Sequence, residues 1–140
     1  MSSSIEGGCL CRAVRYQALG EPLAKTLCHC RTCRLASGAP SVAWVVFRAS
    51  EFRFSAGSPA RFQSSPDVIR TFCSKCGTPL TYQQRSKTDT VDVTTVTLDS
   101  PESFAPTKEI WIEHRLSWES LNVDMAHYAK SSTGASPIDT

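Results

Sequence analysis

The sequence predicts a mainly β domain of antiparallel sheets with one short helix, and three observations support this fold class. Short runs rich in β-branched and aromatic residues recur along the 140-residue chain. Clusters of glycine, proline, serine and aspartate separate these runs, as expected for turns, and no segment shows the periodicity of a long amphipathic helix. A chain of this length can bury one core, so we expect a single domain over residues 1–130. Residues 131–140 lack apolar periodicity, and we expect them to form a flexible tail.

Five runs have the composition of strands, and one segment has that of a helix. The predicted strands are, in chain order, residues 41–47 (SVAWVVF), 52–54, 68–73, 91–98 (VDVTTVTL) and 109–112 (EIWI). Turn residues at 20–22, 56–59, 65–67 and 100–101 separate them. The helix is expected over Arg31–Ser37, because Gly38 can adopt the left-handed conformation that commonly ends a helix.

Seven cysteines fall into three groups, and this grouping is the strongest chemical signal in the chain. The groups are C-x-C (Cys9, Cys11), C-x-C-x-x-C (Cys28, Cys30, Cys33) and C-x-x-C-G (Cys73, Cys76, Gly77). The first residues show no secretory signal, and no stretch approaches the roughly 18 apolar residues of a membrane span. We therefore expect a cytoplasmic, reducing location, where clustered thiols are metal ligands or catalytic groups more often than disulfides.

Four of the cysteines have the spacing of a closed structural zinc site. Cys73 and Cys76 can meet at one ion across a tight turn that Gly77 permits. Cys9 and Cys11 lie two residues apart, so both can face the same ion if an extended strand bends there. Four thiolates leave no free coordination position, so we expect a fold-stabilising role; structural zinc contributes on the order of 10 kcal/mol in small peptides.

The other three cysteines predict a second, open zinc site. Cys28 and Cys30 share the strand geometry, and Cys33 follows on the first turn of the predicted helix. A zinc ion with three protein ligands can bind water, a substrate thiolate or a carbonyl oxygen at its fourth position. One alternative is a closed structural site completed by His29, His114, an acidic side chain or a fixed water. Another is a dithiol redox site at Cys30 and Cys33, which the all-β pattern disfavours.

Several motifs together resemble the glutathione-dependent formaldehyde-activating enzyme family, whose vertebrate relatives include centromere protein V. They are residues 8–11 (GCLC), 28–40 (CHCRTCRLASGAP) followed by SVAWVVF, 72–82 (FCSKCGTPLTY), 97–101 (TLDSP) and 109–118 (EIWIEHRLSW). The resemblance extends over most of residues 5–128. It implies an Mss4-like (β-tent) architecture of antiparallel sheets around structural zinc, and two zinc ions divided over the cysteines in the way the spacing predicts.

The resemblance also implies an activity, namely that of a carbon–sulfur lyase which joins glutathione to a small aldehyde such as formaldehyde and gives S-hydroxymethylglutathione. Three thiolates donate much charge to zinc and weaken its Lewis acidity, so we expect the site to deliver the thiol rather than to activate the carbonyl. Glutathione carries two carboxylates, for which Arg31, Arg34 and Arg70 are candidate partners, although each is more often a solvated side chain. Trp44 is a candidate wall of the site, although strand aromatics are more often core.

Net charge argues against a nucleic-acid partner. The metal-free chain has a formal charge of +2, but two zinc ions add four positive charges and seven thiolates add seven negative ones, which gives about −1. Lysine and arginine are scattered without a run, so no nucleic-acid binding is expected. A homodimer is left open, and the alternative to an enzyme is a non-catalytic, zinc-stabilised binding or scaffold module.

Overall fold

The computed structural model describes residues 4–139, which form two compact units. Unit 1 comprises the described residues up to Ala24 together with Val45–Phe104, and unit 2 comprises Lys25–Trp44 together with the described residues from Ala105 onward. The expected domain over 1–130 and the expected tail over 131–140 also take in residues 1–3 and 140, which lie outside the described part. No helix among the described residues is long and apolar enough to cross a membrane.

Unit 1 contains a small antiparallel sheet with the strand order β1-β2-β5. Its strands are β1 (Ile5–Gly8), β2 (Arg15–Ala18) and β5 (Phe52–Ala56), and β5 follows the short 3-10 helix η1 (Ala49–Glu51). Tyr16 stands opposite Gly7 and is fully buried, and its hydroxyl lies 2.7 Å from Thr97 Oγ1. A Cβ atom at Gly7 would lie 2.4 Å from that hydroxyl, so only glycine lets the two strands approach this closely here.

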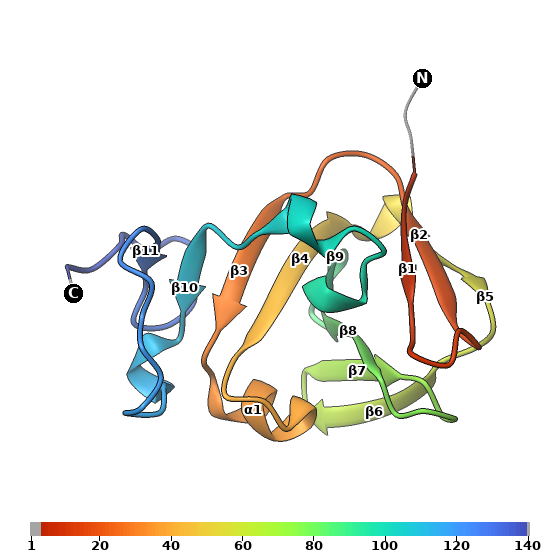
Figure 1. Cartoon of the computed structure of the whole chain (residues 1–140), viewed down its shortest axis with the longest axis horizontal. Coiled ribbons are helices and arrows are strands. Elements are labelled where there is room, and N and C mark those ends of the chain that lie inside the picture. The colour runs from red at the N-terminus through yellow and green to blue at the C-terminus, as the bar shows by residue number, and fades with distance from the viewer. Residues whose placement is uncertain (1–3, 140) are drawn as a thin grey trace. The chain divides into compact units, whose positions relative to one another are not determined.

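Unit 1 also contains an antiparallel meander, shown in green in Figure 1. Its strands are β6 (Ala60–Ser65), β7 (Val68–Phe72), β8 (Pro79–Gln84) and β9 (Lys87–Thr94). In the strand order, β4 (Val42–Arg48) is the neighbour of β9. The 3-10 helices η2 (Thr95–Thr97) and η3 (Pro101–Phe104) follow β9. The largest fully buried side chains of this unit are Tyr16, Phe47, Leu80, Val45, Val93 and Cys73. A cysteine therefore lies within the core itself.

Unit 2 is built on parallel pairing. It contains all but the first residue of β3 (Ala24–Cys28). It also contains α1 (Arg31–Ser37), β10 (Lys108–Ile110), the 3-10 helix η4 (Ile112–His114) and β11 (Ala126–His127). Strand β10 pairs in parallel with β3 and with β11 and lies between them (Figure 1). The stretch after Ser131 is mostly irregular, but the Ile138 N–H donates to the His127 carbonyl at 2.8 Å.

The mainly β fold class with one short α-helix is confirmed. Helix α1 spans Arg31–Ser37 as expected, and Gly38 ends it in the left-handed conformation with φ 69°. The strand expected over 91–98 is wrong at its end, because β9 stops at Thr94 and η2 turns the chain. The parallel pairing of β10 was also not expected, since parallel strands are joined through long connections that local turn signals do not reveal.

Candidate metal centres

The four-thiol cluster comprises Cys9, Cys11, Cys73 and Cys76, and it lies in unit 1. The first two stand in the turn between β1 and β2, and the other two stand in the turn between β7 and β8. The Cys9 and Cys11 sulfurs are 3.6 Å apart, and those of Cys11 and Cys73 are 3.7 Å apart. Zinc bound tetrahedrally at about 2.3 Å requires sulfur separations of about 3.8 Å, whereas a disulfide requires about 2 Å. The spacing therefore fits a metal ion and not a disulfide.

Hydrogen-bond donors surround two sulfurs of this cluster, whereas burial and the neighbouring thiols raise the pKa of the Cys11 thiol to about 11. The Cys73 sulfur accepts from the N–H groups of Lys75 and Cys76 at 3.4 and 3.5 Å, and the turn closes where the Gly77 N–H donates to the Cys73 carbonyl at 2.8 Å. The Thr78 hydroxyl lies 3.2 Å from the Cys76 sulfur and, together with the Thr78 N–H, lowers the pKa of Cys76 to about 5.

Cys9 and Cys11 differ from the geometry expected for them. Rather than lying on a bent strand, they flank a tight turn that continues into Arg12, whose φ of 66° is left-handed. Burial by itself raises the pKa of Cys9, but the Val14 N–H at 3.3 Å and the thiols of Cys11 and Cys73 outweigh it, so that the pKa of Cys9 is lowered. A turn brings both sulfurs to one point as well as a bent strand does.

The three-thiol cluster comprises Cys28, Cys30 and Cys33 and lies in unit 2. Cys28 ends β3, Cys30 is the N-cap of α1, and Cys33 follows in the first turn of that helix. The sulfurs of Cys28 and Cys33 are 3.7 Å apart, and the Cys33 N–H donates to the Cys30 sulfur at 3.3 Å. Cys28 and Cys33 are buried whereas Cys30 is half-buried, so solvent reaches the cluster at Cys30.

Negative charge in the metal-free three-thiol cluster concentrates on Cys30. Hydrogen bonds from the thiols of Cys28 and Cys33 hold the pKa of Cys30 far below its usual range, and the Thr32 hydroxyl at 3.4 Å adds to this effect. The same hydrogen bonds, together with burial, raise the pKa of Cys28. One thiolate supported by two thiols is the arrangement that a soft cation converts to three thiolates when it binds.

Neither histidine considered as a fourth ligand belongs to this cluster. Among the described residues, the ligand atoms that lie within 4.8 Å of one another here are three sulfurs and no nitrogen or carboxylate oxygen. The His29 Nε2 atom is 2.8 Å from Glu109 Oε1, and the His114 ring is 5.1 Å from the Trp111 ring. No further side chain in the described part of the chain offers a ligand atom to this cluster.

The residues expected to contact substrate lie in different environments. Arg31 is exposed on α1, and Arg34, on the same helix, donates from its Nη2 to the His114 carbonyl at 3.3 Å. Trp44 is buried in unit 2. Arg70 is buried in unit 1, where its Nε donates to Ser64 Oγ at 3.0 Å and its guanidinium lies 5.0 Å from the Tyr82 ring centroid. Substrate roles for these side chains stay predictions.

The sequence did not reveal a buried polar network around Glu109 in unit 2. Glu109 is fully buried. Its Oε1 atom contacts the His29 ring. Its Oε2 atom lies 3.0 Å from His127 Nε2 and accepts from the Asn122 N–H at 2.7 Å. The available signals were a glutamate at the start of the apolar run EIWI and a histidine between two metal-ligand cysteines. Neither signal identifies the partner, because 80 residues separate His29 from Glu109.

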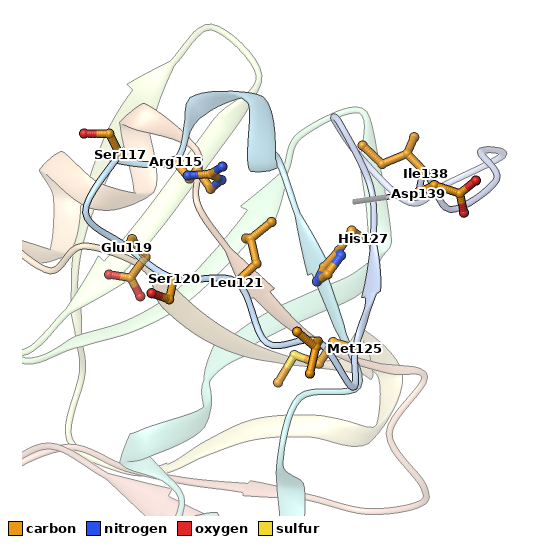
Figure 2. A pocket seen from close by; sticks show the side chains of 10 residues that line it. Arg115, Ser117, Glu119, Ser120, Leu121, Met125, His127, Ile138 and Asp139 are labelled. Carbon is orange, nitrogen blue, oxygen red and sulfur yellow. The ribbon is translucent and has the colours of Figure 1, made fainter.

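A surface pocket of about 570 Å³ lies beside this network, also within unit 2. His127 lines it together with side chains of both charges, among them Arg115, Glu119 and Asp139. Figure 2 shows His127 and Leu121 among the side chains that border the same space. Through His127, the Glu109 network therefore reaches from the three-thiol cluster to a solvent-accessible cavity.

Comparisons with family models, with known proteins and with solved structures each found a match. The model of a family described as glutathione-dependent formaldehyde-activating enzyme matches residues 4–114. An uncharacterized lyase of Schizosaccharomyces pombe is 32% identical over 77 residues, which is 55% of this chain and 56% of that protein, so the chain matches little more than half of this relative's length. A crystal structure of a Rhodobacter sphaeroides protein is similar in fold, with a TM-score of 0.57 and 27% identity over 67% of this chain and 87% of that one.

Proposed function

Since this chain belongs to the glutathione-dependent formaldehyde-activating enzyme family, we propose that it is a zinc-dependent carbon–sulfur lyase acting on glutathione or a similar thiol and a small aldehyde such as formaldehyde. The observation that carries the proposal is the division of the cysteines into a four-thiol cluster and a three-thiol cluster that solvent reaches at Cys30. Four thiols complete a tetrahedral zinc site, whereas three leave one position for a ligand from solution.

Each cluster has its own task in this proposal. Cys9, Cys11, Cys73 and Cys76 would hold a structural zinc ion, and Cys28, Cys30 and Cys33 would hold a second one. When bound at the second site, zinc supplies a positive charge that favours the thiolate form of a neighbouring thiol at neutral pH. The fixed turn before α1 keeps the three sulfurs on one side of the site and leaves the other side to substrate.

The proposed reaction balances without an oxidant or reductant. The glutathione sulfur gives up its proton and forms a bond to the carbonyl carbon, while the π-electron pair of the C=O bond moves to oxygen, which takes up a proton. The product is the hemithioacetal, and the reverse reaction breaks the same carbon–sulfur bond. On α1, which also carries Cys33, Arg31 and Arg34 are our candidates for holding the glutathione carboxylates. We also propose a cytoplasmic location, where glutathione is abundant.

The test follows hemithioacetal formation from glutathione and formaldehyde. Because the reaction also proceeds without enzyme, only a rate in excess of background counts. We expect the excess for the native chain, its loss in Cys33→Ser and after chelation of zinc, and its retention in Arg53→Gln, whose exposed guanidinium contacts Gln17 in unit 1. Equal rates for the native chain and Cys33→Ser would favour the non-catalytic, zinc-stabilised binding module instead.

A further inference from the structure

Three titratable side chains that the proposed reaction does not use are buried together in unit 2. The exposed fractions of His29 and Glu109 are 0%, and that of His127 is 6%. Burying a carboxylate is unfavourable unless hydrogen bonds compensate it, and here both carboxylate oxygens are used. Burying such a polar network costs desolvation free energy, so its position next to the turn that carries Cys28 and Cys30 indicates a role for the network at that turn.

The network fastens the turn that carries two of the three thiols. His29 stands between Cys28 and Cys30, and its backbone N–H donates to the Ile110 carbonyl at 3.1 Å. Its ring reaches the same strand β10 through Nε2, which lies 2.8 Å from Glu109 Oε1. The turn is thus held to β10 at two points, one from the backbone and one from the side chain.

Among the described residues, Glu109 supplies the hydrogen bond that the buried His29 ring makes. Because a carboxylate can only accept, the Nε2 atom of the ring is the donor in this hydrogen bond. The other ring nitrogen, Nδ1, is buried and has no hydrogen-bond partner among the described residues. In the described part of the chain, removal of the Glu109 carboxylate therefore leaves the His29 ring without a hydrogen bond.

We propose that Glu109 is a positioning residue for the three-thiol site, acting through His29 to hold the Cys28–Cys30 turn in the geometry that binds the metal. The inference rests on the second zinc site of the proposed function, but not on its substrates. Hydrogen-bond partners one step outside a metal's ligands commonly change metal affinity 10- to 100-fold when they are mutated. His127 and the Asn122 N–H support Glu109 from the pocket side through Oε2.

The experiment measures zinc release from the purified full chain to a chromogenic chelator. The native chain should release two zinc ions in two phases, with the faster phase from the three-thiol site, which Cys33→Ser identifies by abolishing it. In Glu109→Ala and His29→Leu, which remove the carboxylate or its donor, the faster phase should accelerate 10- to 100-fold while the slower phase stays unchanged. His29→Gln keeps an N–H donor and should lie within about threefold of the native chain. Glu113→Gln is the matched control, because Glu113 is a half-exposed carboxylate of the same unit that lies 3.8 Å from His114.

Each outcome decides the proposal. An unchanged faster phase in both removal variants overturns it, and so does equal acceleration of both phases, which would reveal general destabilisation instead of positioning. If Glu109→Ala does not fold, the comparison of His29→Leu with His29→Gln decides alone, because both keep the Glu109 carboxylate. Failure of the proposed function looks different: the native chain would release zinc in two phases but show no hemithioacetal formation above background. A single release phase in the native chain would overturn both proposals.

Discussion

The four-thiol cluster predicts a large loss of stability when one of its ligands is removed, and Cys11→Ser is the sharpest perturbation. Cys11 is exposed, so the substitution leaves the core intact and changes little except the ligand set. A metal ion at this cluster joins Cys11 to Cys73, which are 62 residues apart in the chain. Joining two positions stabilises a fold by reducing the entropy of its unfolded chain, and the gain grows with the length of the loop that is closed.

The size of this effect follows from the separation. Treated as a cross-link, a closed loop of 62 residues contributes about 4 kcal/mol to the free energy of unfolding. The same relation gives about 2 kcal/mol for the three-thiol cluster, where Cys28 and Cys33 are 5 residues apart. Domains are stable by only about 5–15 kcal/mol, so losing the ion, and with it the longer link, removes a large share and should lower Tm by roughly 15 °C for a chain of this size. Cys11→Ser has this full effect when the three remaining thiols, which include Cys9, release the ion.

The assay is thermal unfolding followed by circular dichroism, with and without a zinc chelator. We expect chelation to lower the Tm of the native chain by about the same amount as Cys11→Ser, and to lower that of the variant much less. Cys30→Ser serves as the comparison and should cost about half as much free energy. A Cys30→Ser variant that is destabilised as strongly as Cys11→Ser would refute the loop-length reasoning. So would a Cys11→Ser variant that keeps the native Tm.

Three further predictions concern other features of the two units. Burial raises the pKa of Asp92 from 3.8 to about 7, so the native state binds a proton that the unfolded state has already lost. The contribution of Asp92 to the free energy of unfolding therefore falls as pH rises from about 4 to 7. Asp92→Asn should remove this fall and stabilise the chain by up to about 4 kcal/mol at pH 8. Urea unfolding of the native chain and of Asp92→Asn at pH 4.5 and pH 8 measures this, with the exposed Asp89→Asn as control. A gain in stability from Asp92→Asn that is no larger at pH 8 than at pH 4.5 would contradict it. Gly7→Ala should destabilise the chain by about 2–4 kcal/mol in the same assay, because the new Cβ would lie 2.4 Å from both the Tyr16 hydroxyl and the Thr97 carbonyl oxygen. A loss below about 0.5 kcal/mol would show that the strands can separate to accommodate a methyl group. In chelator-treated protein at pH 6, iodoacetamide should label Cys30 before Cys28 and Cys33, because the pKa of Cys30 is lowered and Cys30 is the least buried of the three. Peptide mass spectrometry identifies the labelled residue. Labelling of Cys28 first would contradict the placement of the negative charge on Cys30.

The sequence predicted those parts of the fold that depend on neighbouring residues. Gly38 ends α1 because its left-handed conformation is a local property, and the short spacings within each cysteine group bring sulfurs together through single turns. The pairing of Cys9 and Cys11 with Cys73 and Cys76 was inferred by counting ligands, since zinc needs four, and the structure places all four sulfurs together.

Features that depend on strand pairing between residues far apart in the chain could not be predicted from the sequence. Strand β10 is only three residues long, and nothing in its sequence specifies that it lies parallel to β3. The burial of Glu109 follows from that pairing, because Glu109 stands opposite Leu27 and so comes within reach of His29. Arg70 was considered for its charge, but its packing against Tyr82 depends on the register of β7 with β8, which the sequence does not state.

The distance along the chain between His29 and Glu109 also sets an order of events during synthesis. Ribosomes add about 5–20 residues per second, so the 80 residues between them take roughly 4–16 seconds to appear. The three cysteines around His29 emerge together, because Cys28 and Cys33 are only 5 residues apart. During this interval the nascent chain presents three neighbouring thiols without the carboxylate that later anchors their turn. On this reasoning, the three thiols are most open to oxidation, or to capture of the wrong metal, before Glu109 leaves the ribosome.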